Sequence, residues 1–111
     1  MSDPRIRQIK IKTGVVKRLT KEKTVYVKEI DQQKVRIERL RGEGKDEHVL
    51  RKEEEILQEA QMMVPDSHRR LVKAYEELND YLKNEDELKE LPDFGAALEV
   101  LKQAKEKIDI D

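Results

Sequence analysis

The chain has 111 residues, of which 36% are hydrophobic and 44% are charged, and its formal net charge is −1. A chain of this length builds one domain with a small core, so most of its surface faces water. Cysteine is absent, which excludes a disulfide framework, cysteine zinc sites and thiol catalysis. Three tyrosines, one phenylalanine and no tryptophan, together with abundant Lys, Glu, Leu, Gln and Arg, predict an all-α protein.

The near-neutral net charge hides a gradient along the chain. Residues 1–28 carry nine lysines and arginines against two acids, whereas residues 76–111 carry five against twelve. Such asymmetry fits either a basic end that meets an acidic partner or opposite segments that attract each other when the chain folds back. The two alternatives stay open from the sequence.

Neither a membrane nor a nucleic acid is an expected partner. The start, MSDPRIRQIKIK, is charged and unlike a signal sequence, and no stretch approaches the roughly twenty apolar residues that span a bilayer. The basic segment 5–23 has no interleaved aromatic side chains on which bases could stack, so its lysines are expected to be solvated or to face a protein partner. We expect a cytoplasmic protein.

The first predicted helix covers residues 4–41. Asp3 followed by Pro4 is typical of an N-cap and a first helical position, and the glycines at 42 and 44 are expected to end the helix. Seven of ten heptad positions are apolar, which indicates a core-facing stripe. Those positions are Ile9, Lys12, Val16, Leu19, Lys23, Tyr26, Ile30, Gln33, Ile37 and Leu40.

The second predicted helix covers residues 46–83, with Asp46 as its cap. Its heptad register, from Leu50 to Tyr81, passes through Pro65 without a change of phase, so the proline is expected to bend a continuous helix. Five further apolar residues widen the core-facing side, as in a helix that packs against two neighbours. They are Val49, Ile56, Met63, Tyr75 and Leu82.

A shorter third helix is predicted over residues 88–108. Pro92 either begins this helix or kinks one that starts near Asp86. The expected core positions, with Lys105 as the one polar member, are Leu88, Leu91, Phe94, Leu98, Leu101 and Ile108. The three helices predict a single domain over residues 1–111, an antiparallel left-handed three-helix bundle, with a dimeric coiled coil as the alternative.

No pattern in the sequence indicates an enzyme or a cofactor site. RGEGK lacks the spacing of a phosphate-binding loop, and the consecutive Asp66, Ser67 and His68 point about 100° apart on a helix, so they do not form a hydrolase triad. His48 and His68 are the only histidines and have no partners at metal-ligand spacing. We therefore expect no metal, no cofactor and no catalysis.

Two segments resemble the tubulin-binding cofactor A family, also called tubulin-specific chaperone A. They are DPRIRQIKIKTGVVKRLTKEK at 3–23 and EEILQEAQMMVPDSHRRL at 54–71, and the likeness extends over nearly the whole chain. The resemblance implies a three-helix bundle with a proline-kinked second helix. It also implies a cytosolic, cytoskeleton-associated chaperone that captures β-tubulin released from the cytosolic chaperonin and passes it on for αβ-heterodimer assembly.

The resemblance further implies helical contacts with β-tubulin, and with other tubulin-folding cofactors as additional partners. The candidate residues lie in or beside the matching segments and outside the heptad core, with Pro65 as the structural kink. They are Lys10, Lys17, Arg18, Lys21, Gln58, Glu59, Met62, Arg69 and Arg70. The alternative function is a coiled-coil adaptor or oligomerisation module with another client, and the sequence leaves monomer against homodimer open.

Overall fold

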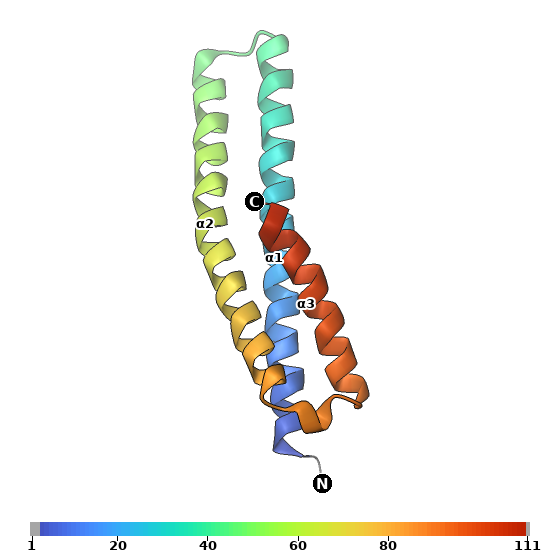
Figure 1. Cartoon of the computed structure of the whole chain (residues 1–111). Helices are drawn as coiled ribbons and strands as arrows, with labels where there is room; N and C mark the ends of the chain where they lie inside the picture. The colour runs from blue at the N-terminus through green and yellow to red at the C-terminus, as the bar shows by residue number, and fades with distance from the viewer. Residues whose placement is uncertain (1–2, 111) are drawn as a thin grey trace.

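The computed structural model describes residues 3–110, and this part of the chain is a three-helix bundle, which confirms the predicted all-α class. The helices are α1 (Pro4–Gly42), α2 (Glu47–Lys83) and α3 (Pro92–Ile110), with a 3-10 turn, η1 (Asp86–Leu88), between α2 and α3. α2 runs antiparallel to both other helices (Figure 1). The result is a rod of 63 × 25 × 17 Å.

The helix ends follow from local capping. Asp46 accepts a hydrogen bond from the His48 backbone N–H at 2.9 Å and caps α2. α1 ends in a Schellman motif, in which Gly44 adopts a φ of 72° and the Lys45 N–H bonds the Leu40 carbonyl at 3.1 Å. α3 begins at Pro92, four residues after the predicted start, because Leu88 belongs to the separate turn η1.

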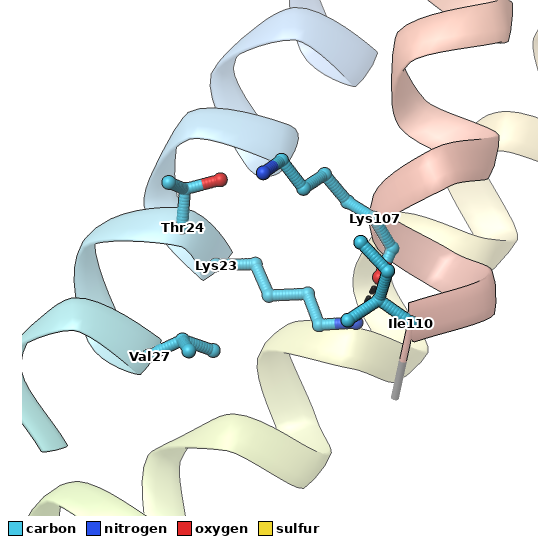
Figure 2. Close-up of a pocket in the computed structure, with 5 residues that line it drawn as sticks. All are labelled: Lys23, Thr24, Val27, Lys107 and Ile110. Carbon is cyan, nitrogen blue, oxygen red and sulfur yellow. Dashed lines mark hydrogen bonds between the residues drawn. The ribbon is translucent and has the colours of Figure 1, made fainter. Parts of the chain in front are cut away.

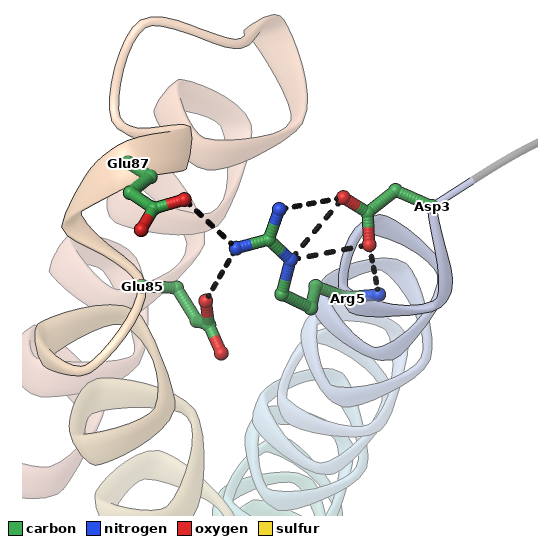
Figure 3. A network of polar contacts seen from close by, with 4 residues as sticks. All are labelled: Asp3, Arg5, Glu85 and Glu87. Atoms are coloured by element: carbon green, nitrogen blue, oxygen red, sulfur yellow. Dashed lines mark hydrogen bonds and ion pairs between the residues drawn. The ribbon is translucent and has the colours of Figure 1, made fainter.

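Arg5 ties the start of α1 to the connection between α2 and α3 (Figure 3). Asp3 accepts from the Arg5 backbone N–H and from its guanidinium, both at 2.8 Å, while Arg5 Nη1 lies 3.3 Å from both Glu85 and Glu87. The bonds with Asp3 and Glu87 raise the pKa of Arg5, and the bonds from Arg5 lower the pKa of Asp3. The cluster therefore holds the N-terminal end of α1 against the connection between α2 and α3.

The third helix reaches only half of the rod. α1 has 39 residues and α3 has 19, which at 1.5 Å per residue correspond to about 58 Å and about 28 Å. In Figure 1 the C-terminal end of α3 lies near the middle of α1, and above it only α1 and α2 remain. We call this two-helix part, residues 28–63, the arm, and the three-helix part the body.

The body contains the hydrophobic core. All three helices and η1 contribute to it, and Ile6, Leu91 and Ile108 pack at its margin. The buried core residues are Ile9, Val16, Leu19, Leu71, Ala74, Leu78, Leu82, Leu88, Phe94, Ala97, Leu101 and Ala104. In the arm, by contrast, only Ile37 and Leu40 are buried among the described apolar residues, and each keeps 5–8% of its surface exposed.

The predicted core register of α3 is wrong at two positions. Leu98 is 51% exposed and Lys105 is also exposed, whereas Ala97 and Ala104 have no exposed surface. Small residues at these positions let the helix backbone approach the cleft between α1 and α2 closely, and the larger Leu98 is left outside.

The expected second packed face of α2 is also wrong over the arm. Tyr75 and Leu82 pack into the body core as predicted, but Val49, Ile56 and Met63 are 42%, 48% and 46% exposed. The physical reason is the side of α2 on which they lie. The three residues follow a seven-residue row that leads to Arg70, on the side of α2 that faces away from α3, so no third helix covers them.

α2 continues through Pro65 and bends near the middle of its length (Figure 1). The proline has no N–H to donate to the Gln61 carbonyl, and its ring pushes that carbonyl aside, which tilts the helix. Below the bend α2 leans towards α1 and α3. The bend thus lies where the arm meets the body.

Lys23 lies at this same junction and is 1% exposed, as its place in the core-facing heptad indicates, although the basic segment as a whole was expected to carry solvated or partner-facing lysines. Its Nζ donates to the Lys107 carbonyl in the last turn of α3 at 2.8 Å (Figure 2). The same Nζ lies 2.8 Å from His68 Nδ1 on α2. A buried ammonium group requires such partners.

In the arm, polar contacts hold the two helices together. Gln33 Nε2 donates to the Glu53 carboxylate at 2.7 Å and to its backbone carbonyl at 2.9 Å, and Arg36 lies 3.2 Å from the same carboxylate. The bond from Gln33, followed by that from Arg36, lowers the pKa of Glu53. The arm is therefore joined by hydrogen bonds as well as by its narrow apolar seam.

We predict that Lys23→Met lowers the free energy of unfolding by about 1–2 kcal/mol, because it keeps the aliphatic volume but leaves buried acceptors unpaired. Amides near the end of α3 should exchange with solvent faster. Urea unfolding and hydrogen exchange measure both effects. Lys28→Met, at an exposed position one turn further along α1, is the matched control and should change neither; equal effects of the two variants would contradict this role of Lys23.

Candidate functional site

All nine candidate contact residues are exposed, but they do not form one patch. They are distributed over two opposite sides of the α1–α2 pair, which the following contacts define. On the first side, Thr24 and Val27 line a small pocket with Lys107 and Ile110 at the end of α3 (Figure 2). We call this the α3 side.

Beyond the end of α3, the α3 side continues as a groove of about 560 Å³ along the arm. Its walls are mostly polar or charged, with Ile37 and Leu57 at its floor. The lining residues are Lys34, Ile37, Glu38, Arg41, Glu54, Leu57, Gln58 and Gln61. Of the candidates, Gln58 lies in this groove, and Lys10 and Lys17 share a seven-residue row with Thr24 on the same side.

The opposite side of the pair carries most of the other candidates, and we call it the open side. Arg18 and Lys21 line a hollow of about 390 Å³ together with Glu22, Val25 and Tyr26. The Tyr26 hydroxyl donates to Glu22 at 3.2 Å, and burial followed by the charge of Glu22 raises the pKa of that tyrosine. Arg18 and Lys21 are thus brought together.

Arg70 joins the two helices on the open side. Its guanidinium lies 3.0 Å from Glu22 on α1 and 3.1 Å from Asp66 on its own helix, and the bond with Glu22 raises its pKa. The salt bridge of Arg69 among the described residues is with Asp66 alone, at 3.3 Å, on its own helix. Arg70 therefore has a structural role as an interhelical partner, while Arg69 stays available to a ligand.

The remaining candidates surround the bend. Met62 and Arg69 are seven residues apart on the outward surface of α2, and Met62 is among the most exposed large apolar side chains described. Glu59 precedes Asp66 by seven residues, which places it beside the open side. Pro65 itself is exposed between them.

The residues that resemble catalytic or metal-binding sets have structural roles or lie apart. Ser67 is fully buried, His68 Nδ1 faces Lys23, and Asp66 pairs with two arginines, so no nucleophile and base are aligned. Within residues 3–110, no group of three or more His, Asp or Glu side chains could hold a metal ion. No helix in that range is long and apolar enough to cross a membrane.

Sequence reasoning missed one feature of this surface. The exposed residues Val25, Val49, Ile56 and Met63 were assigned to the core or left out of the candidate set, although they lie beside it. The sequence carried no signal that separates the two cases, because a seven-residue apolar row reads the same whether a third helix packs on it or leaves it open.

Comparisons with known proteins agree with this architecture. The family model described as Tubulin binding cofactor A matches residues 4–108. A human protein named tubulin-specific chaperone A is 51% identical over 105 residues, covering 95% of this chain and 97% of that protein.

Two solved structures have the same fold. The human tubulin chaperone cofactor A structure is 49% identical with a TM-score of 0.81, covering 92% of this chain and 99% of the other. Tubulin folding cofactor A from Arabidopsis thaliana is 33% identical with a TM-score of 0.86, covering 93% and 97%. By the match over its whole bundle, the chain belongs to the tubulin-binding cofactor A family.

Proposed function

We propose that this chain is a tubulin-folding cofactor that binds β-tubulin released from the cytosolic chaperonin, holds it and passes it on for αβ-heterodimer assembly. The observation that carries the proposal is the family match over residues 4–108 together with a human relative named tubulin-specific chaperone A. The proposal includes a cytoplasmic, cytoskeleton-associated location and other tubulin-folding cofactors as further partners.

The geometry supports a holding function. A holding protein needs a reversible surface and no chemistry, and the long helices present side chains on a scaffold that is already ordered. The open side and the outward surface of α2 combine cationic, polar and apolar groups over much of the rod. Preformed helical surfaces of this kind bind a partner with little ordering cost, and their charges speed encounter with an acidic one.

Within this proposal we expect the nine candidate residues to contact the client, and their salt bridges within the chain indicate which of them are available to do so. Arg18, Lys21 and Arg69 are the cations best placed to contact the client, because Arg70 is engaged with Glu22. The bend at Pro65 sets the angle between the arm and the body, and therefore the shape of the surface that the client meets.

The second candidate function is a coiled-coil adaptor or oligomerisation module. The exposed apolar residues of the arm favour it, because unpartnered apolar rows on long helices are typical of self-association. This function and the chaperone function differ in the partner that they require.

Size-exclusion chromatography with light scattering separates the two functions. We predict that the purified chain forms a 1:1 complex with β-tubulin released from chaperonin and none with α-tubulin. Self-association together with no complex with either subunit would contradict the chaperone function and support the adaptor.

A charge reversal tests the contact hypothesis. We predict that Arg69→Glu weakens β-tubulin capture about tenfold, equivalent to about 1.4 kcal/mol, because it places an acid against an acidic client. Helix content by circular dichroism should not change, since Arg69 is exposed and its one salt bridge within residues 3–110 is with Asp66 on the same helix. Lys102→Glu, an exposed reversal on α3, is the matched control, and an equal loss in both variants would contradict a specific contact.

A further inference from the structure

An apolar row runs along the open side of the arm with no helix of the chain above it. Val49, Ile56 and Met63 follow one another at seven-residue spacing on α2, and Val25 continues the row on α1 near the bend. Each of the four is between 42% and 48% exposed. We call these four residues the apolar stripe.

The stripe lies along a shallow groove rather than on a ridge. One hollow of about 390 Å³ is lined by Ile56 and Ala60 of α2 and by Glu29, Gln32, Gln33 and Arg36 of α1. The hollow with Arg18, Lys21 and Val25 follows it, since positions 18, 25 and 32 lie on one row of α1. The groove therefore runs from Arg36 and Ile56 in the arm down to Arg18 in the body.

The charge at the lower end of this groove is positive. Arg18 and Lys21 are exposed there and take part in none of the salt bridges found within residues 3–110. The nearby acids Glu22 and Asp66 are both paired with Arg70. An acidic group on a partner would thus meet two available cations beside Val25.

We propose that the apolar stripe binds one amphipathic helix of the client, with its apolar face on Ile56 and Met63 and its acidic end at Arg18 and Lys21. The two hollows extend from Arg36 to Arg18 on α1, 18 residues or about 27 Å, so a client helix of about 14–20 residues matches the groove. An apolar groove with charges at one end is how proteins recognise such helices. The inference rests on the proposed function, because it assigns the helix to β-tubulin.

The positive charge at the lower end of the groove favours a client helix over a second copy of the chain. A copy docked in parallel would place its own Arg18 and Lys21 against these cations. An acidic helix both covers the apolar surface and neutralises them. The lysine- and arginine-rich N-terminal part of the chain supplies the complementary field.

The double variant Ile56→Gln/Met63→Gln tests the stripe, since glutamine preserves helix propensity and removes apolar contact. We predict about tenfold weaker binding of chaperonin-released β-tubulin, with unchanged circular dichroism and thermal midpoint. The matched control is Val35→Gln/Leu98→Gln, two apolar side chains that are 70% and 51% exposed away from the stripe, and it should bind within twofold of wild type.

Binding by the wild type tests the proposed function, and the difference between the two double variants tests the stripe. Absence of binding by the wild type overturns the proposed function, whereas wild-type binding with equal affinities for both double variants overturns the stripe alone. A wild-type dimer that becomes monomeric only in Ile56→Gln/Met63→Gln would assign the stripe to a second copy and also overturn the proposal.

A salt series tests the acidic end of the client helix. Arg18→Gln/Lys21→Gln should weaken binding several-fold at low ionic strength and much less at about 0.5 M salt, where exposed charges are screened. The same loss at both ionic strengths would overturn the electrostatic part of the proposal.

Discussion

The contact that organises this rod is the buried Lys23. Its ammonium group is held by the Lys107 carbonyl at the end of α3 and by His68 on α2, so one α1 side chain joins all three helices at mid-height. A buried cation without these partners would be strongly unfavourable, and the end of α3 is stabilised where the lysine donates. The position of Lys23 on α1 therefore coincides with the boundary between the three-helix body and the two-helix arm.

On one side of that boundary lies most of the hydrophobic core, and on the other lies most of the uncovered surface. The body buries twelve core residues between three helices, while the arm depends on a narrow seam and on contacts such as Gln33–Glu53. Covering the arm with a longer third helix would bury Leu57 more deeply on the α3 side, but it would leave the apolar stripe on the open side exposed. A surface that is ordered, partly apolar and uncovered is what a protein that holds another protein temporarily requires.

Local signals were sufficient for both ends of α1 and for the bounds and path of α2, but not for the start of α3, where Leu88 belongs to a separate turn. Asp3, Asp46 and the glycines after Leu40 act within one turn, and the unbroken heptad through Pro65 needs no tertiary information. Tertiary packing decided the rest. Ala97 and Leu98 are both apolar, and the sequence does not say which of them is buried. The close approach of α3 to the other two helices buries the alanine and leaves the leucine exposed. The candidate site could be predicted as a set of exposed residues, but their division between two sides, and the pairing of Arg70 with Glu22, depend on how the helices face one another.

In this chain the three-helix body keeps the fold, while the open side of the arm and the adjoining residues around Arg18 and Lys21 bind the client. Hydrogen–deuterium exchange of the chain, alone and in complex with β-tubulin, measures this division. In the free chain, arm amides in residues 28–63 should exchange faster than body amides. In the complex, exchange should slow in residues 18–36 and 49–63 and stay unchanged in α3. Slower exchange in α3 with an unchanged arm would contradict this division between body and arm.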